Sequence, residues 1–384
     1  MDFDRKNSVL ITCARDLVEY LAQEVRALHF SIETTHSTGL ALKASFYDCL
    51  KLNLWLRTAF SVLYLLKEFK AQSPYQLYDN VFRYPWEDLI SADEYISVVS
   101  RIDTKVVNNS MFASQKVKDA IVDRILKKSG QRPDSGSTRD NVVVNLYWKD
   151  HDCWLYLNTS GRKLSDRGYR KIPGKAPLQE TLAAGIIMAA GFTGDAPLVI
   201  PMAGSGSLAV EACLLALNKA PGLLRSNFGF MHIKDFEHDK WFKLRKEVLA
   251  QTKKKLDYPV IASDIDQKAI EAAQKNAQTA GVGHFIEFHS CGLVDTPIPK
   301  AKGIIVLNPP YGKRLGELKD LERLYSFIGD FFKQKCPGYT AYVFTGNLEL
   351  AKKVGLRASS RIPFYNADIE CRLLRYDMYE GSRK

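Results

Sequence analysis

The segment Ile304-Ile-Val-Leu-Asn-Pro-Pro-Tyr-Gly-Lys-Arg314 decides the fold that we predict for this chain. Its first four residues form a short apolar run, typical of a buried strand, which ends at Asn308. Two prolines follow, and they cannot continue a strand ladder because they lack N–H donors. The loop therefore presents carbonyl acceptors, the ring of Tyr311 and then two cations. Acceptors beside a ring suit a flat substrate that bears an amine.

Strand-like and helix-like patterns alternate around this segment from Pro197 to the C-terminus. This alternation predicts an α/β fold with an open, mainly parallel sheet, and we expect the last two strands to form a hairpin that adds one antiparallel edge. In such a sheet the ligand lies at the carboxyl ends of the strands, where the strand order reverses. The predicted strands are residues 198–200, 260–262, 285–288, 303–307, 340–344, 361–364 and 370–379.

Two further loops follow predicted strands of this sheet. In Pro201-Met-Ala-Gly-Ser-Gly206, two glycines let the backbone approach a ligand and open a helix whose N–H groups face it, although a plain turn fits equally well. In Ser263-Asp-Ile-Asp266, an aspartate can bind ribose hydroxyls or cap the next helix. Gly206 and Asp264 are 58 positions apart. A dinucleotide fold expects about 20, so a nicotinamide cofactor is disfavoured.

The N-terminal half predicts two smaller domains. Residues 1–70 order short strands and two helices as in a ferredoxin-like α+β sandwich. Residues 71–165 hold a long helical pattern, 111–128, between strand-like runs. We therefore divide the chain into 1–70, 71–165 and 166–384.

Positive charge is concentrated in one part of the chain. The net charge is +11, and from Arg101 to Lys175 we count 16 Lys and Arg against 8 Asp and Glu, a net of +8. Residues Gly161–Lys171 alone carry five cations around Tyr169. Such a run fits two interpretations equally well. One is a solvated linker, and the other is a hinge that faces nucleic acid, in which cations pair with phosphates and the ring stacks on a base. The local excess predicts a surface for phosphates.

Several classes of protein are disfavoured. Seven scattered cysteines without a C-x-x-C pair indicate neither a disulfide framework nor a zinc site. Histidines and acids gather between His232 and Asp239, but the aromatic residues beside them favour ordinary packing, and we predict no metal. No apolar run reaches the length of a membrane span, and the first residues lack a signal-peptide pattern, so we expect a cytoplasmic protein.

Four motifs stand out along the chain: Arg167-Gly-Tyr-Arg170, Ala176-Pro-Leu-Gln-Glu-Thr-Leu-Ala183, Pro201-Met-Ala-Gly-Ser-Gly206 and Asn308-Pro-Pro-Tyr-Gly312. Together they resemble the THUMP-containing guanine-N2 RNA methyltransferases, in the RlmL/YpsC-like branch. The resemblance covers nearly the whole chain and is most specific from Arg167 to Arg314. It implies a ferredoxin-like start, a THUMP RNA-binding domain and a Rossmann-like class I domain that uses S-adenosylmethionine.

The resemblance also implies residue roles. The Asn308 side chain and the Pro309 carbonyl would accept the two N–H groups of a guanine amine, beside Pro310, and Tyr311 would stack on an extruded base. The implied cofactor residues are Pro201, Ala203, Gly204, Gly206, Asp264, Ile265 and Asn308. The predicted RNA contacts are Arg162, Lys163, Arg167, Tyr169, Arg170, Lys171, Lys313 and Arg314.

This chain departs from the family pattern near the cofactor. Ile200 stands where an Asp is usual, Ala203 and Ser207 replace Cys and Thr, and Gly292 replaces an Asp whose place Asp295 could take. Our leading hypothesis is methyl transfer to N2 of a guanine in RNA, with large-subunit (23S) ribosomal RNA as the substrate. The alternatives are a tRNA guanine-N2 methyltransferase and a catalytically silent RNA-binding protein of the same fold. The expected assembly is a monomer or a homodimer.

Overall fold

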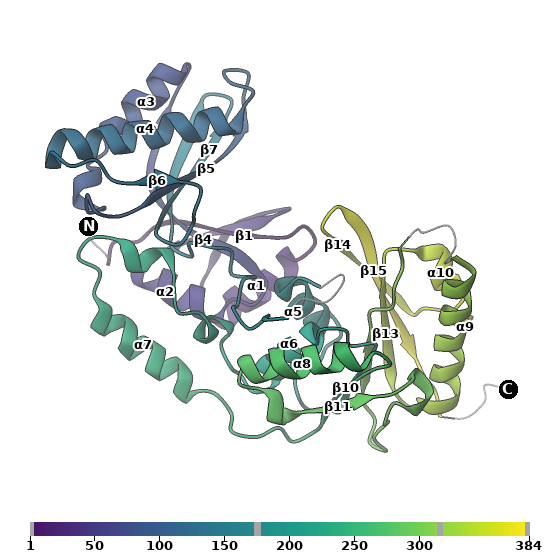
Figure 1. Ribbon diagram of the computed structural model, residues 1–384. Helices are drawn as coiled ribbons and strands as arrows, with labels where there is room; N and C mark the ends of the chain where they lie inside the picture. The colour runs from purple at the N-terminus through teal and green to yellow at the C-terminus, as the bar shows by residue number, and fades with distance from the viewer. Residues whose placement is uncertain (1–3, 173–177, 313–317, 381–384) are drawn as a thin grey trace. The chain divides into compact units, whose positions relative to one another are not determined.

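The computed structural model describes residues 4–172, 178–312 and 318–380 (Figure 1). Its contacts divide the chain into two units, which are described separately. The first comprises Met1–Cys13, Leu21–Asp166 and Arg225–Val248, and the second comprises Ala14–Tyr20, Arg167–Leu224 and Leu249–Lys384. One division therefore falls after Asp166, beside the predicted boundary. The inclusion of Arg225–Val248 in the first unit differs from our prediction.

The first unit is built on one eight-stranded sheet in the order β2-β3-β1-β4-β8-β7-β5-β6. Strand β4 pairs with β1 on one side and with β8 on the other, so the two predicted N-terminal domains share this sheet. The strands are β1 (Asn7–Cys13), β2 (Ile32–His36), β3 (Gly39–Ala44), β4 (Ala59–Lys70), β5 (Ile96–Asp103), β6 (Ser135–Gly136), β7 (Val142–Lys149) and β8 (Asp152–Asn158).

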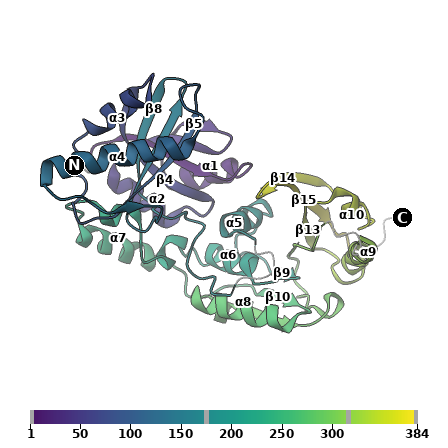
Figure 2. The ribbon, with the colours of Figure 1, turned by 45° about the horizontal axis from the view of Figure 1, so that its top comes forward.

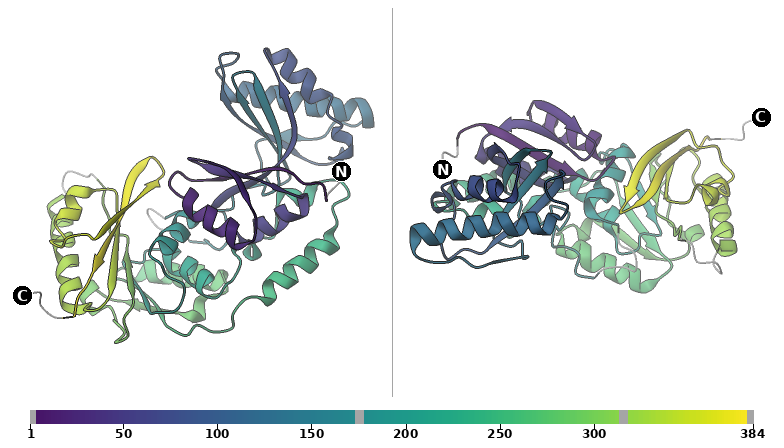
Figure 3. Two further views of the ribbon diagram at one scale, coloured as in Figure 1. Left: turned by 180° about the vertical axis from the view of Figure 1, so that it is seen from behind. Right: turned by 90° about the horizontal axis from the view of Figure 1, so that it is seen from above.

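Helices of this unit begin where the sequence supplies capping residues. Helix α2 (Phe46–Trp55) starts at Ser45 with a complete capping box, and α3 (Pro74–Phe82) starts at Ser73 with proline in its first turn. Helix α4 (Ser110–Ser129) is capped by Asn109 and stops at a left-handed glycine. Helices α3 and α4 lie side by side (Figures 1 and 3), and α4 contacts β5.

The helices cover one face of the sheet. Register places Val9, Tyr64, Leu157 and Val144 in one row across β1, β4, β8 and β7, and all four are buried. The ring of Phe46, from α2, packs edge-on against Tyr64 in that row. Because neighbouring residues of a strand point to opposite faces, the residues beside these four lie on the other face of the sheet.

Residues Arg225–Val248 join the first unit through a buried arginine, and an aromatic cluster packs within the segment itself. The rings of Phe228, Phe230 and Trp241 pack together at centroid distances of 4.9–5.5 Å. Arg225 donates hydrogen bonds to the carbonyls of Lys163 and Ser160 at 2.7 and 3.0 Å. The sequence does not show that this segment joins the first unit, because the hydrogen bonds of Arg225 reach residues 62 and 65 positions away.

The stretch His232–Asp239, which is rich in histidine and acidic residues, makes hydrogen bonds and an ion pair within the protein. His232 approaches Asn227 at 2.7 Å, and Glu237 pairs with Lys240 of α7 (His238–Ala250). Within the described ranges, no group of three His, Cys, Asp or Glu residues has the arrangement of a metal site. In the same part of the chain, no helix has the length and apolar character needed to cross a membrane.

The second unit contains a seven-stranded sheet in the order β11-β10-β9-β12-β13-β15-β14. The chain runs outward from β9 to β11 and then returns to β12 on the other side of β9, so the strand order reverses between β9 and β12. Strands β9 to β13 pair in parallel. The strands are β9 (Leu198–Pro201), β10 (Val260–Asp264), β11 (Ile286–Ser290), β12 (Ile304–Leu307), β13 (Thr340–Thr345), β14 (Ser360–Asn366) and β15 (Ile369–Asp377).

The final hairpin forms the antiparallel edge that we predicted, and the structure adds the order of its two strands. Strand β15 is antiparallel to both β13 and β14, and it lies between them, so β14 forms the edge. Both Leu373 and Leu374 of β15 are buried, which fits a strand covered on both faces. Pro363 in β14 fits an edge strand, because proline cannot donate to a ladder.

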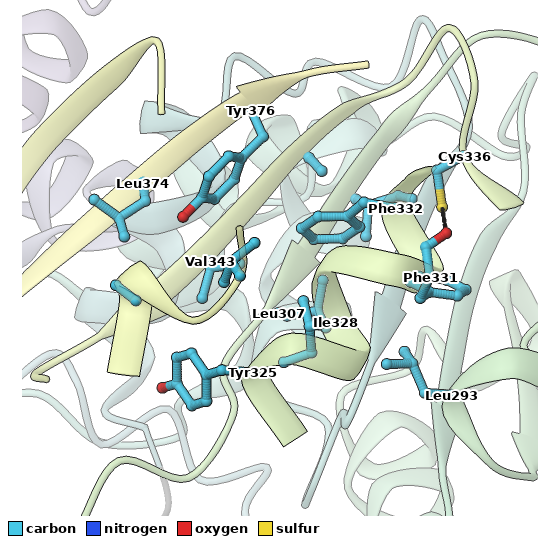
Figure 4. Close-up of a cluster of buried hydrophobic side chains, with 14 of the residues drawn as sticks. Leu293, Leu307, Tyr325, Ile328, Phe331, Phe332, Cys336, Val343, Leu374 and Tyr376 are labelled. Atoms are coloured by element: carbon cyan, nitrogen blue, oxygen red, sulfur yellow. Dashed lines mark hydrogen bonds between the residues drawn. The ribbon is translucent and has the colours of Figure 1, made fainter. Parts of the chain in front are cut away.

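A large apolar cluster supports this sheet below the strand ends (Figure 4). Helix α9 (Leu318–Lys335) contributes Tyr325, Ile328 and Phe332, which pack against Leu307 of β12 and Tyr376 of β15. Figure 2 shows α9 beside β13 and α8 beside β10. The cluster fixes the strand ends from which the loops emerge. The other helices are α5 (Glu180–Ala189), α6 (Ser207–Ala216), α8 (Gln267–Thr279) and α10 (Leu348–Lys352).

Candidate active site

Three loops meet where the strand order reverses. Register pairs Pro201 at the end of β9 with Ser263 of β10, and it pairs Val199 with Ile305 of β12. The loops after β9, β10 and β12 therefore emerge at one edge of the sheet, as ligand sites of open α/β sheets require. They are the three loops that the sequence singled out.

The glycine loop after β9 is tied to the loop after β10. Ala203 N–H donates to the Ser263 carbonyl at 3.0 Å, and Gly204 N–H donates to Asp264 Oδ2 at 2.9 Å. Gly204 has φ +55°, and a Cβ there would meet no described atom within 4 Å, so open space lies beside this residue. A Cβ at Gly206 would lie 2.8 Å from Ala273 of α8, so glycine is needed there for packing.

Helix α6 begins directly after this loop. Its first position follows Gly206, and no described side chain caps it. The first N–H groups of a helix have no partner within the helix and carry partial positive charge. This terminus is therefore suited to a ligand that bears acceptor groups.

The two aspartates after β10 have separate roles. Asp266 caps α8 by accepting from Lys268 N–H at 2.9 Å. Asp264 accepts from Gly204 N–H and from Asp266 N–H, and each of its oxygens keeps a further lone pair for a hydroxyl group. Ile265 between them is 81% exposed, which leaves its side chain open to an apolar ligand surface.

The loop after β12 contains an unsatisfied acceptor. Asn308 Oδ1 is buried and has no hydrogen-bond partner among the residues that the structure describes. An unpaired buried carbonyl is costly, so this atom is poised to accept from a ligand N–H group. Pro309 is buried and Pro310 is exposed.

The ring of Tyr311 is held by strands β13 to β15. Its hydroxyl accepts from Asn366 Nδ2 at 2.9 Å, and its ring meets Phe344 edge-on at 6.4 Å. A Cβ at Gly346 would come within 3.0 Å of the ring, so the glycine makes room for it. Burial raises the pKa of Tyr311 to about 12, so the phenol stays protonated.

The departures from the family pattern take two forms. Ile200 is fully buried in β9, so an apolar core side chain stands where the family usually has a carboxylate. A Cβ at Gly292 would lie 3.7 Å from Asp295 Oδ2. The Asp295 carboxylate thus stands beside the position where the family usually has its acid.

The structure contradicts two of the predicted RNA contacts. Arg167 and Tyr169 are each 1% exposed. Arg167 pairs with Glu211 of α6 at 3.3 Å, and the Tyr169 hydroxyl donates to the same carboxylate at 3.1 Å. Burial and the charge of Glu211 raise the pKa of Tyr169 far above its usual value. The prediction that these two residues contact RNA is therefore wrong, because an internal ion pair occupies them.

The neighbouring arginine is also engaged inside the second unit. Arg170 pairs with Glu180 at 3.0 Å and donates to the hydroxyl of Ser207 at 3.2 Å. Asn276 of α8 accepts from the backbone N–H of Lys171 and donates to the Ser205 carbonyl. This segment therefore braces the glycine loop instead of linking two domains loosely.

Sequence reasoning missed Glu211, Glu180 and Asn276. A signal for Glu211 was present, because it is the one charged residue in the otherwise apolar helix Ser207–Ala216. An isolated acid in an apolar helix indicates a buried partner of opposite charge. No comparable local signal marks Asn276.

The other predicted RNA residues remain predictions. Arg162, Lys163 and Lys171 are exposed, and Arg162 forms ion pairs with Asp140 and Asp166. Lys163 lies over the ring of Phe60 at 4.7 Å. Lys313 and Arg314 lie outside the described residues.

Family models match three consecutive parts of the chain. Residues 8–63 match the RlmL ferredoxin-like domain, residues 71–158 the THUMP domain and residues 167–375 the RMKL-like methyltransferase domain. The order agrees with the three domains that the sequence predicted.

Relatives match along most of the chain. The protein slr0064 of Synechocystis sp., whose name provisionally gives it as an RNA methyltransferase, is 35% identical over 96% of both chains. Ribosomal RNA large subunit methyltransferase K/L of Syntrophotalea carbinolica is 38% identical over 96% of this chain and 53% of its own length. The chain thus spans about half the length of this relative.

Solved structures share the fold. A possible methylase from Clostridium difficile 630 has a TM-score of 0.87 and 27% identity, covering 99% of this chain and 100% of its own. The protein SMU.472, solved in complex with SAH, has a TM-score of 0.86 and 25% identity, with the same coverage. The chain therefore belongs to the RMKL-like methyltransferase family, with a RlmL ferredoxin-like domain and a THUMP domain preceding its catalytic domain.

Proposed function

We propose that this protein transfers a methyl group from S-adenosylmethionine to N2 of a guanine in RNA, with large-subunit ribosomal RNA as the substrate. The observation that carries the proposal is the buried Oδ1 of Asn308, which lies where the strand order reverses and has no hydrogen-bond partner in the described part of the chain. Such an atom accepts a hydrogen bond from an amine, which is the group that this reaction modifies. The names of the K/L relatives support ribosomal RNA.

The residues around the glycine loop fit S-adenosylmethionine. The open space at Gly204 and the uncapped start of α6 suit its methionine part, and Asp264 has lone pairs left for ribose hydroxyls. The exposed Ile265 suits the adenine face. When bound, the cofactor supplies an electrophilic methyl group on a sulfonium. SMU.472, which shares the fold, was solved with SAH.

The loop after β12 explains how a weak nucleophile would be prepared. The lone pair of the guanine amine is delocalised into the ring, so the enzyme must hold the amine in a reactive orientation. Asn308 Oδ1 and the Pro309 carbonyl would accept its two N–H groups. Tyr311, which Asn366 and Phe344 hold in place, would lie against the base. Catalysis then rests on positioning and electrostatics.

The substitution Asn308→Ala tests this assignment. We expect methyl transfer to fall at least a hundredfold, the usual effect of losing one well-placed polar group, while RNA affinity changes less than twofold. The assay follows labelled methyl groups into ribosomal RNA and tRNA from a deletion strain, followed by nucleoside analysis for N2-methylguanosine. Gln334→Ala, an exposed amide on α9, is the matched control. Full activity of Asn308→Ala, or label in another nucleoside, contradicts the proposal.

The buried Ile200 favours a second candidate, a silent RNA-binding protein of this fold. Calorimetry with S-adenosylmethionine separates the two. The proposal predicts a saturable heat of binding that Asp264→Ala weakens at least tenfold. Absence of heat at millimolar cofactor, together with intact RNA binding, establishes the silent protein instead.

A further inference from the structure

The face of the eight-stranded sheet that the helices leave open carries a row of aromatic side chains. Tyr147 of β7 lies opposite Trp154 of β8, and the next pair on the same face is Asn145 with Tyr156. The rings of Tyr147 and Tyr156 meet edge-on at 5.8 Å. Tyr147 and Trp154 are only half-buried, whereas Tyr156 packs on Leu63 and Leu65. The apolar pair thus forms a floor that holds the rings in place.

A hollow of about 760 Å³ lies over this row. Its walls come from both halves of the sheet, with Thr12 and His36 on one side and Arg101 and Lys149 on the other. The volume is within the usual range of about 300–1,000 Å³ for small-ligand sites. The hollow therefore has room for flat rings above the aromatic row.

The charge at this hollow favours an anion. Arg101 and Lys149 are both exposed, and Arg101 lies directly opposite Tyr147 in register. Asp103 is the acid at the rim, and Glu68 lies opposite Trp154 on β4. Among the residues that line the hollow, these two cations stand against one acid, Asp103, which gives a net charge of +1 with the histidine neutral. A ligand with flat rings and phosphates matches this arrangement.

We propose that this hollow binds an unpaired stretch of RNA, with a base stacked on Trp154 or Tyr147 and a neighbouring phosphate on Arg101 or Lys149. Every base has a face that stacks on an aromatic ring, and an open sheet face with such rings is a common platform for single strands. A double helix keeps its bases stacked inside and cannot offer them to the rings. The choice of RNA as the ligand rests on the proposed function, but the site is separate from Asn308.

The experiment measures binding of fluorescein-labelled twelve-nucleotide RNA to the full-length protein without cofactor. We expect a single strand to bind at least tenfold more tightly than a duplex of the same length. Trp154→Leu and Tyr147→Leu should each weaken single-strand binding about fivefold or more, because a stacked base is lost. Arg101→Gln should weaken it about threefold and lower its salt dependence.

Matched controls separate the site from general effects. Tyr75→Leu removes an exposed ring from α3, and Lys128→Gln removes an exposed cation from α4, and both should leave affinity unchanged. Circular dichroism checks that each variant folds. If an aromatic variant does not fold, the Arg101→Gln variant, at an exposed position, tests the site instead. Equal binding of single strand and duplex, or unchanged affinity of the folded variants, overturns the proposal.

The same measurements distinguish this inference from the proposed function. Asn308→Ala should bind the single strand normally, whereas Trp154→Leu should retain the heat of S-adenosylmethionine binding. If the variants at the hollow lose affinity for an unstructured peptide and not for RNA, the hollow is a protein-binding site and the inference fails.

Discussion

The loop Asn308–Tyr311 and the segment Arg167–Arg170 lie in the same unit, and the sequence marked both as functional. In the loop, a buried oxygen of Asn308 has no hydrogen-bond partner among the residues that the structure describes. In the segment, Arg167 and Arg170 are engaged by Glu211 and Glu180. A sequence motif therefore marks residues that matter, but it does not say why they matter. A polar group whose partners lie within the protein serves the fold, whereas a buried polar group without such a partner is suited to bind a ligand.

The largest expected effect is on the stability of the buried network. Glu211→Ala leaves Arg167 buried without its counter-charge, and we expect a loss of about 3–5 kcal/mol in the free energy of unfolding. Urea denaturation followed by circular dichroism measures it. The double variant Arg167→Met/Glu211→Leu should recover most of this loss, because it removes both charges together.

The corresponding change in the loop sharpens the contrast. Asn308→Ala should alter the free energy of unfolding by less than about 1 kcal/mol, because its Oδ1 makes no hydrogen bond with the described residues. If Asn308→Ala destabilised the protein as much as Glu211→Ala does, the loop would also be structural and the comparison would fail.

A further prediction concerns Lys171, the exposed cation directly after the segment Arg167–Arg170. Lys171 is exposed, unlike Arg167, so its side chain is free to approach a phosphate. We expect Lys171→Gln to weaken RNA binding a few-fold and to reduce the slope of log affinity against log salt by about 0.7–1. Lys335→Gln, at an exposed position in the last turn of α9, is the control. An unchanged slope for Lys171→Gln would exclude this residue from the RNA surface.

The sequence predicted the parts of the site that depend on local rules. Gly204, Asp264 and Asn308 each follow a short apolar strand, and strand ends of a parallel sheet meet at one edge. Asp266 was predictable as a helix cap for the same reason, since capping depends only on the next few residues.

What the sequence could not predict depends on contacts between distant residues. A local hairpin pattern does not say which of its strands pairs with β13, so the sequence predicted the antiparallel edge but not the order of β14 and β15 in it. Leu373 and Leu374 of β15 are both buried, which fits an inner strand, but their burial is known only from the folded structure. The local excess of positive charge likewise predicted that Arg167 contacts RNA, because its partner Glu211 is 44 residues away in the sequence.

The last prediction concerns an ion pair that is neither fully buried nor fully exposed. Arg124 of α4 makes two hydrogen bonds to Glu87, at 2.6 and 2.9 Å, and the two side chains are 18% and 24% exposed. These hydrogen bonds lower the pKa of Glu87 below its usual value. A carboxylate with a lowered pKa stabilises the fold above its unfolded pKa and loses this contribution as the pH falls through the folded value.

The direction of the pH dependence follows from the lowered pKa of Glu87. At neutral pH, Arg124→Gln should lower the free energy of unfolding by about 1 kcal/mol, well below the effect of Glu211→Ala, because water reaches the pair. The difference from the wild-type protein should shrink as the pH falls below about 4.3, where glutamate without its partner becomes protonated. Urea denaturation at a series of pH values measures this, with Lys118→Gln as the control for lost charge elsewhere on α4. A difference that stayed constant down to low pH would mean that Arg124 stabilises α4 through packing and not through the charge of Glu87.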